Sequence, residues 1–167
     1  NTAYGSGIVA KGTGILMNNE MDDFSIKPGT PNAYGLVGSE ANKIESRKSP
    51  LSSMSPTVVF KNSKPVLITG SQGGSMIINT VFQEILNILE FEMKLSESNK
   101  KERVHYQWKP DILFHEGLSK DLIEELSEEM RLYERKIGET QSIALENDEY
   151  KGWIDYRRPD GKKIELH

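Results

Sequence analysis

A β-branched segment that runs through a glycine turn into a helix constrains the fold most. Residues 66–69 (Val-Leu-Ile-Thr) are typical of a buried strand, and residues 70–75 (Gly-Ser-Gln-Gly-Gly-Ser) permit a sharp backbone turn after it. The apolar residues from Ile77 to Leu89 then recur at about the 3.6-residue spacing of an amphipathic helix. We therefore predict a strand, a glycine turn and a core helix in that order.

Two hairpins are expected on either side of this helix. Both are indicated by apolar, β-branched runs that are separated by turn residues. The first pairs residues 57–60 with residues 66–69, and we expect both of its strands to be buried. The second pairs residues 142–145 with residues 153–156. Such hairpins with helices beside them predict an α+β fold in a single domain over residues 1–167.

The other segments are predicted to be helices and loops. Residues 118–135 predict a second helix, acidic near its start and basic near its end, as the helix dipole favours. Residues 94–103 are polar and predict a short helix and loop on the surface. Residues 1–56 are rich in Gly, Asn, Ser and Pro, which predicts loops around brief strands. Within them, residues 27–35 hold two prolines and two glycines, so we expect no regular structure there.

Composition excludes several classes of function. The 21 Lys and Arg residues against 25 Asp and Glu residues give a formal net charge of −4, which argues against general binding to a nucleic-acid backbone. No apolar segment approaches the roughly 18 residues of a membrane span. Without Cys there is no disulfide framework, thiolate nucleophile or Cys-ligated zinc. The start at Asn1, with no Met and no signal sequence, predicts a processed or truncated product.

Gly73 and Gly74 stand where the predicted strand meets the predicted helix. Backbone N–H groups at a helix N-terminus point toward negative charge, and residues without Cβ let a ligand approach the backbone closely. The pair is therefore a candidate oxyanion hole or anion-binding turn, and a purely structural β-to-α turn is the alternative. A P-loop is excluded because no Gly-Lys-Ser/Thr follows.

Two polar clusters precede the first hairpin. Ser52 and Ser53 stand between prolines and offer hydroxyl donors to a carboxylate, but without a Gly-x-Ser-x-Gly elbow neither is predicted to be a nucleophile. Glu20, Asp22 and Asp23 suit an ammonium ion or a hard metal, and a solvated acidic turn is the alternative. Their spacing is not that of a calcium loop.

The histidines do not predict a metal site. His105, His115 and His167 lack the spacing of metal ligands, so we interpret them as packing or surface residues.

Three motifs, in this order, resemble the small subunit of the γ-glutamyltranspeptidases, which are N-terminal nucleophile hydrolases. They are residues 16–24 (Leu-Met-Asn-Asn-Glu-Met-Asp-Asp-Phe), residues 50–57 (Pro-Leu-Ser-Ser-Met-Ser-Pro-Thr) and residues 70–75. The resemblance covers nearly the whole chain. It implies an αββα four-layer sandwich that is completed by a large subunit from the same precursor, so the chain would be most of a small subunit.

The resemblance also implies a reaction, the transfer and hydrolysis of γ-glutamyl groups from glutathione and γ-glutamyl amides. The precursor cleaves itself, and the new N-terminal Thr attacks the donor to form a γ-glutamyl-threonine enzyme that passes to water or an acceptor amine. That Thr precedes the position of Asn1 in the family and is not in this chain. No cofactor and no metal are implied, and the expected location is extracytoplasmic: periplasmic, secreted or on the cell surface.

The resemblance further assigns the polar groups of the donor to three sets of residues. Backbone N–H groups bind the oxyanion, hydroxyl groups bind the α-carboxylate, and carboxylates with an amide bind the α-ammonium. These sets are Gly73 and Gly74, then Ser52 and Ser53, then Asn1, Glu20 and Asp23. Tyr34, in a lid loop over residues 28–39, is expected to close over the bound glutamyl group by hydrogen bonding with Asn1.

Two alternatives stay open. Within the superfamily, a capsule depolymerase would cut or transfer poly-γ-glutamate. Arg157 and Arg158 favour such a polyanionic substrate, and the lid-like loop counts against it. The absent Thr favours the other alternative, a catalytically silent fragment or homologue.

Overall fold

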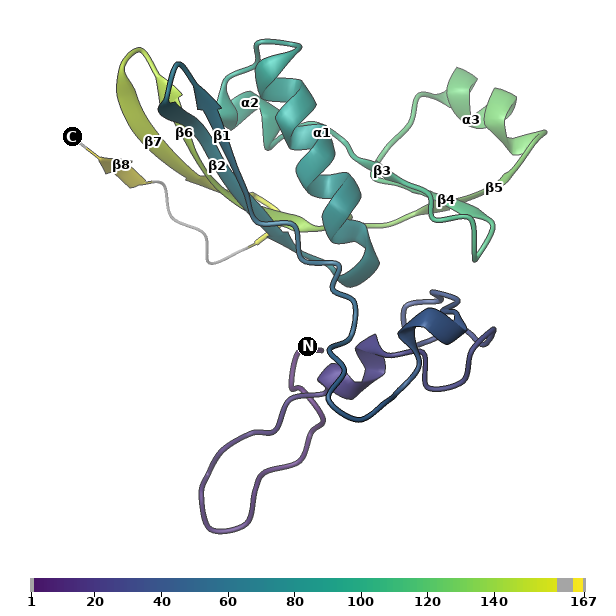
Figure 1. Ribbon diagram of the computed structural model, residues 1–167. Coiled ribbons are helices and arrows are strands. Elements are labelled where there is room, and N and C mark those ends of the chain that lie inside the picture. The colour runs from purple at the N-terminus through teal and green to yellow at the C-terminus, as the bar shows by residue number, and fades with distance from the viewer. Residues whose placement is uncertain (1, 159–163, 167) are drawn as a thin grey trace. The chain divides into compact units, whose positions relative to one another are not determined.

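The computed structural model describes residues 2–158 and 164–166, and the chain forms two compact units, Asn1–Ser52 and Ser53–His167 (Figure 1). Each unit is described by itself, so the single domain expected over residues 1–167 stays a prediction. In the described residues, no helix combines the length and the apolar character needed to cross a membrane.

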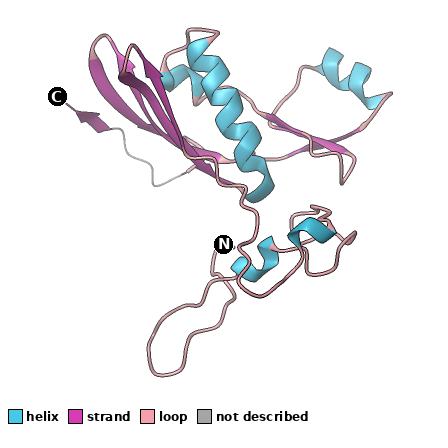
Figure 2. Cartoon of the chain, in the orientation of Figure 1, coloured by secondary structure: helices cyan, strands magenta, loops and turns pink. Residues whose placement is uncertain are grey.

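The first unit consists of loops around two short 3₁₀ helices, η1 (Glu20–Asp23) and η2 (Glu40–Asn42) (Figure 2). Isolated β-bridges join Val9 to Leu16, Ser25 to Lys43 and Pro31 to Val37. The loop-rich character predicted for this part of the chain is therefore confirmed. Residues 27–35 contain no helix and only an isolated bridge, as their prolines and glycines predicted.

The second unit is built on a five-stranded antiparallel sheet with the order β1-β2-β6-β7-β8. Its strands are β1 (Thr57–Lys61), β2 (Lys64–Gln72), β6 (Glu139–Glu146), β7 (Glu149–Ile154) and β8 (Ile164–Leu166). The first predicted hairpin is confirmed as β1 with β2. The second also forms, as β6 with β7, but its second strand is Glu149–Ile154 and not residues 153–156, so most of its predicted pairs are wrong. Helix α1 (Ile77–Leu89), also predicted, packs on β2 and β6, and the short helix α2 (Leu95–Ser98) follows it (Figure 1).

The apolar core lies between α1 and one face of this sheet. Leu67 and Ala144 are paired neighbours on β2 and β6, and both are buried together with Leu95 of α2. The opposite face of the sheet stays exposed in the described residues, with Val58 at 49% and Ile68 at 40%. The prediction that both strands of the first hairpin are buried is therefore wrong for this face of β1 and β2, because α1 covers only the other face of the sheet.

A smaller sheet contains β3 (Val104–His105), β4 (Ile112–His115) and β5 (Arg131–Glu134), beside helix α3 (Lys120–Ser127). The helix predicted over residues 118–135 is thus only partly confirmed, since it ends early and its last residues form β5. Strand β5 pairs in parallel with β4, and the Tyr133 ring meets the Phe114 ring edge-on at 6.0 Å. This tertiary pairing overrides the local helical pattern.

The fold class is α+β, as predicted. The polar segment over residues 94–103 is the clearest correction, because much of it is buried and not on the surface. Ser98, Asn99 and Arg103 are each at most 3% exposed. The partners that allow this burial lie far along the chain.

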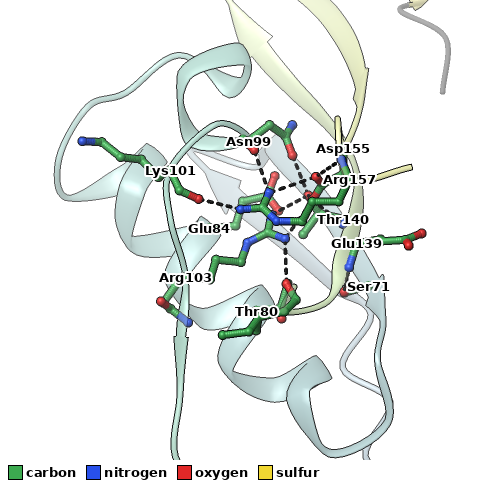
Figure 3. Close-up of polar contacts among 12 residues, drawn as sticks. Ser71, Thr80, Glu84, Asn99, Lys101, Arg103, Glu139, Thr140, Asp155 and Arg157 are labelled. Atoms are coloured by element: carbon green, nitrogen blue, oxygen red, sulfur yellow. Dashed lines mark hydrogen bonds and ion pairs between the residues drawn. The ribbon is translucent and has the colours of Figure 1, made fainter. Parts of the chain in front are cut away.

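Buried charges join these distant segments (Figure 3). Asp155 lies between two guanidinium groups, with Arg103 Nη1 2.8 Å from its Oδ2 and Arg157 Nη1 2.9 Å from its Oδ1. Arg157 also forms an ion pair with Glu116. Burial alone would raise the pKa of Asp155, but the Arg103 charge and the N–H groups of Thr140 and Arg157 hold it below its usual value.

The same arginines bind backbone carbonyl groups. Arg157 donates to the carbonyl oxygens of Asn99 and Lys101, each at 2.8 Å. Arg103 donates to the carbonyl oxygen of Ile137 at 3.1 Å. The charges therefore tie the segment after α2 to the connection between β5 and β6.

Glu84 on α1 is a buried carboxyl group at the edge of this cluster, and its side chain appears in Figure 3. Its Oε1 is buried without a hydrogen-bond partner in the described residues, and its Oε2 lies 3.4 Å from the Thr69 hydroxyl. Burial raises the pKa of Glu84, and the Ser142 and Thr140 hydroxyls and the Arg103 charge only partly oppose that rise.

We expect Glu84→Gln to remove a pH dependence of stability. Because the pKa of Glu84 is raised in the folded state, its contribution is fully present below the pKa of the unfolded chain and is lost as pH rises through the folded value. The variant should therefore gain stability relative to wild type as pH rises from about pH 5 to about pH 8, measured by urea unfolding. Glu90→Gln, at the exposed end of α1, is the control. A difference between Glu84→Gln and wild type that does not change with pH would contradict this assignment.

Candidate functional site

The predicted glycine turn leads from β2 into α1. Strand β2 ends at Gln72, and a 3₁₀ turn, η3 (Gly74–Met76), precedes the helix. Gly73 has φ +135° and Gly74 has φ +58°, values that residues with a Cβ rarely adopt. Within the described residues, no hydrogen bond is donated by the N–H of either glycine. The first N–H groups of a helix have no partner inside it, so both groups are available to an anion.

Gly138, which immediately precedes β6, lies directly against this turn. A Cβ built on Gly73 would stand 3.2 Å from Gly138 Cα. Gly138 itself has φ +62°, and a Cβ there would stand 2.3 Å from Thr80 Oγ1. Sequence analysis did not identify Gly138, because a single glycine outside any motif does not indicate which distant residues it contacts.

The side chain of Gln107 supports the glycine turn through a hydrogen bond with Ser75. The Ser75 hydroxyl donates to Gln107 Oε1 at 2.7 Å, and His105 Nε2 lies 2.8 Å from the same oxygen. Gln107 Nε2 donates to the carbonyl oxygen of Lys109 at 2.8 Å, which orients the amide. His105 is buried and its Nδ1 lies 2.9 Å from Asn79 Oδ1, so it is a packing residue, one of its two predicted roles.

Neither of the two described histidines contributes to a metal site. His115 is also buried, and His167 lies outside the described residues. Across residues 2–158 and 164–166, no group of three or more His, Cys, Asp or Glu side chains is arranged to hold a metal ion.

The acidic cluster predicted from the sequence forms η1 in the first unit. Burial raises the pKa of Asp23, and the hydrogen bond and negative charge of Glu20 raise it further. Asn42 ties this turn to a later segment, since its Nδ2 donates to the carbonyl oxygen of Asp23 at 2.8 Å and its Oδ1 accepts from the N–H of Leu51 at 3.0 Å. The segment that ends at Ser52 is thereby anchored to the acidic turn. No sequence pattern indicated Asn42.

Tyr34 is half-buried in the predicted lid loop. Asn32 Oδ1 accepts hydrogen bonds from the N–H groups of Tyr34 at 2.9 Å and Leu36 at 3.0 Å, which gives the loop a defined shape. Asn1 lies outside the described residues, and so does its predicted hydrogen bond with Tyr34.

The candidate residues thus fall into two groups. The first unit holds the residues expected to bind the amino group of the donor, the lid tyrosine and one serine. The second unit holds the other serine, which is half-buried, and the glycine turn. These groups are Glu20, Asp23, Tyr34 and Ser52 in the first unit, and Ser53, Gly73 and Gly74 in the second.

Comparisons with known proteins agree with the motifs. The family model described as Gamma-glutamyltranspeptidase matches residues 1–164. The chain is 48% identical over 165 residues to the glutathione hydrolase proenzyme of Escherichia coli K12, covering 96% of this chain and 28% of that protein. The chain thus spans less than a third of the length of this curated relative.

Solved structures show the same relation. A point mutant of Helicobacter pylori γ-glutamyltranspeptidase matches with a TM-score of 0.89 and 45% identity, over 95% of this chain and 89% of that chain. The Bacillus anthracis transpeptidase CapD matches with a TM-score of 0.73 and 17% identity, over 99% of this chain and 88% of that chain. The second match shows a shared fold and nothing more.

Proposed function

The chain belongs to the γ-glutamyltranspeptidase family, and from that premise we propose that it is the small subunit of an enzyme that transfers and hydrolyses γ-glutamyl groups. The proposed donors are glutathione and other γ-glutamyl amides, and the acceptor is water or an amine. The nucleophile is an N-terminal Thr that precedes Asn1 in a self-cleaving precursor, and the intermediate is a γ-glutamyl ester of its hydroxyl. Neither a cofactor nor a metal takes part in this proposal.

The glycine turn carries the proposal. Attack on an amide carbonyl places negative charge on its oxygen, and preorganised N–H donors stabilise that charge more than any other single group in such sites. Gly73 and Gly74 present two N–H groups at the start of η3 that have no partner in the part of the chain that the structure describes. We assign these N–H groups to the oxyanion hole.

The α-ammonium and the α-carboxylate of the glutamyl group have opposite charges, so they require different binding residues. Glu20 and Asp23 are assigned to its α-ammonium, together with Asn1. The raised pKa of Asp23 supports this, because the adjacent negative charge of Glu20 that helps to raise it would also attract a bound cation. Ser52 and Ser53 are assigned to the α-carboxylate as hydroxyl donors, and Tyr34 is assigned to the lid.

The exposed apolar surface of the second unit supports a partner subunit. Val58 and Ile68 lie on the sheet face that α1 does not cover, and Ile78 and Phe82 of α1 are 54% and 56% exposed. A second sheet packed on the uncovered face, with its own helices beyond, would form the αββα sandwich. We assign that sheet to the large subunit of the same precursor, in a heterodimer located outside the cytoplasm.

The function is tested on the full-length precursor after its cleavage. We expect turnover of a γ-glutamyl anilide and of glutathione, and a small subunit whose intact mass includes residues upstream of Asn1 that begin with Thr. Turnover of poly-γ-glutamate alone would overturn this function in favour of a capsule depolymerase. Absence of turnover with every donor would favour a silent homologue.

Gly74→Ala should lower kcat by about 10²-fold, the usual cost of losing one oxyanion donor. Alanine keeps the N–H, but its Cβ is strained at φ +58°, and relief of that strain would move the N–H away from the oxyanion. Gly12→Ala is the matched control, because Gly12 has φ +79° and open space around a Cβ. Near-normal kcat in Gly74→Ala, measured with the anilide, would refute the oxyanion assignment.

Asp23→Asn should raise the KM for a γ-glutamyl anilide by about tenfold or more, since a hydrogen bond to a charged group contributes about 1.5–3 kcal/mol. The KM for a glutaryl anilide, which has no α-amine, should not change. Asp22→Asn, in the same turn, provides the control. Equal effects on the two anilides would remove Asp23 from the ammonium site.

A further inference from the structure

Gly138 faces the glycine turn across the last pair of the β2–β6 ladder. Gln72 and Glu139 form that pair, so the residues that continue beyond it, Gly73 and Gly138, come close together. The Cβ position on Gly73 is 3.2 Å from Gly138 Cα and 3.6 Å from Gly138 N. The backbones meet at this distance because neither residue has a side chain.

There is no room for a side chain on Gly138. A Cβ there would stand 2.3 Å from Thr80 Oγ1, 2.8 Å from Thr80 Cγ2 and 2.9 Å from Ser71 Oγ. Both neighbours are held in place. The Thr80 hydroxyl donates to the carbonyl oxygen of Met76 at 2.9 Å, and the Ser71 hydroxyl donates to the carbonyl oxygen of Gln72 at 2.7 Å. These two carbonyl groups flank the turn on its two sides.

The segment that carries Gly138 is restrained from moving away from a clash, because Ile137 on one side and Thr140 on the other are held by buried charged groups. Ile137 is fully buried, its N–H donates to Glu116 Oε1 at 2.7 Å, and its carbonyl oxygen accepts from Arg103. The N–H of Thr140 donates to Asp155 Oδ2 at 3.0 Å. Figure 3 shows Arg103, Thr140 and Asp155 together with Ser71, Thr80 and Glu139. A side chain on Gly138 would therefore press on the Thr80 and Ser71 side chains, whose hydroxyls bind the carbonyl groups on the two sides of the turn.

We propose that Gly138 is a positioning residue for the oxyanion turn. The segment over residues 137–140 is held by the buried charges, and through Gly138 it limits where Gly73 and its N–H group can lie. The proposal rests on the function proposed above, in which this N–H group binds the oxyanion. Gly138 itself does not touch the substrate. Its effect belongs to the chemical step, because the residues assigned to the α-ammonium and α-carboxylate are elsewhere in the chain.

Gly138→Ala in the processed full-length enzyme should lower kcat for a γ-glutamyl anilide by about 10- to 100-fold, since small displacements of catalytic groups have effects of this size. The KM should stay within about threefold of wild type, because donor binding is not altered. Gly14→Ala is the matched control. Gly14 has φ +70° with nothing within 4 Å of a Cβ, so it shares the backbone strain and lacks the clash.

A double variant separates positioning from general destabilisation. Thr80→Ala removes the closest atoms that a Cβ on Gly138 would meet, so it should restore part of the kcat lost in Gly138→Ala. If the Gly138→Ala precursor does not cleave itself, the Ser71→Ala variant tests the positioning role instead. It removes the hydroxyl that joins the N–H of Glu139, at 3.1 Å, to the carbonyl oxygen of Gln72, and it should lower kcat without raising KM.

The positioning role is overturned if wild type turns over the anilide while Gly138→Ala keeps the kcat of Gly14→Ala. It is also overturned if Gly138→Ala raises KM at unchanged kcat, or if Ser71→Ala leaves kcat at the wild-type value. An inactive wild-type enzyme would instead overturn the proposed function on which the role rests.

Discussion

Asp155 lies between Arg103 and Arg157 in the interior of the second unit, and the surrounding segments depend on that arrangement. Burying an ion costs several kcal/mol, and only pairing and further hydrogen bonds offset this cost. Here each guanidinium group also binds backbone carbonyl groups, of Asn99, Lys101 and Ile137. Loss of one partner would leave a buried charge uncompensated, at a cost of about 3–5 kcal/mol. The charges thus hold together the segment after α2, the β5–β6 connection and the residues after β7.

The buried ion pairs affect the position of the glycine turn through the packing of β2 against β6. Leu67 and Ala144 set the register of β2 against β6 in the apolar core, and the register places the β5–β6 connection beside Gly73. The buried arginine Arg103 then holds that connection in place. Donors that stabilise a transient oxyanion are effective when they need no reorganisation at the moment of reaction. In the proposed function, core packing and buried charge together supply such rigidity to the N–H groups of Gly73 and Gly74.

Sequence patterns predicted the elements whose signal is local. The hairpin of β1 and β2, the periodic helix α1 and the turn between β2 and α1 were all found, because strand propensity, helical spacing and glycine each act over a few residues. Residues 131–134 were predicted to be helical, but they form a strand that pairs with β4. The prediction failed because this pairing cannot be inferred from neighbouring residues. The polar segment over residues 94–103 was expected on the surface, yet Asn99 and Arg103 are buried against distant partners.

The sequence by itself determined the family and the α+β class, and it named the site residues that are proposed above, because short motifs carry the residue types on which both depend. Only the tertiary structure decided how these residues are supported. Asn42 links Asp23 to Leu51, and Gly138 meets Gly73. Each of these contacts joins residues that are far apart in the chain, so no local spacing records them. They exist because the folded chain brings distant backbone groups within hydrogen-bonding or van der Waals distance.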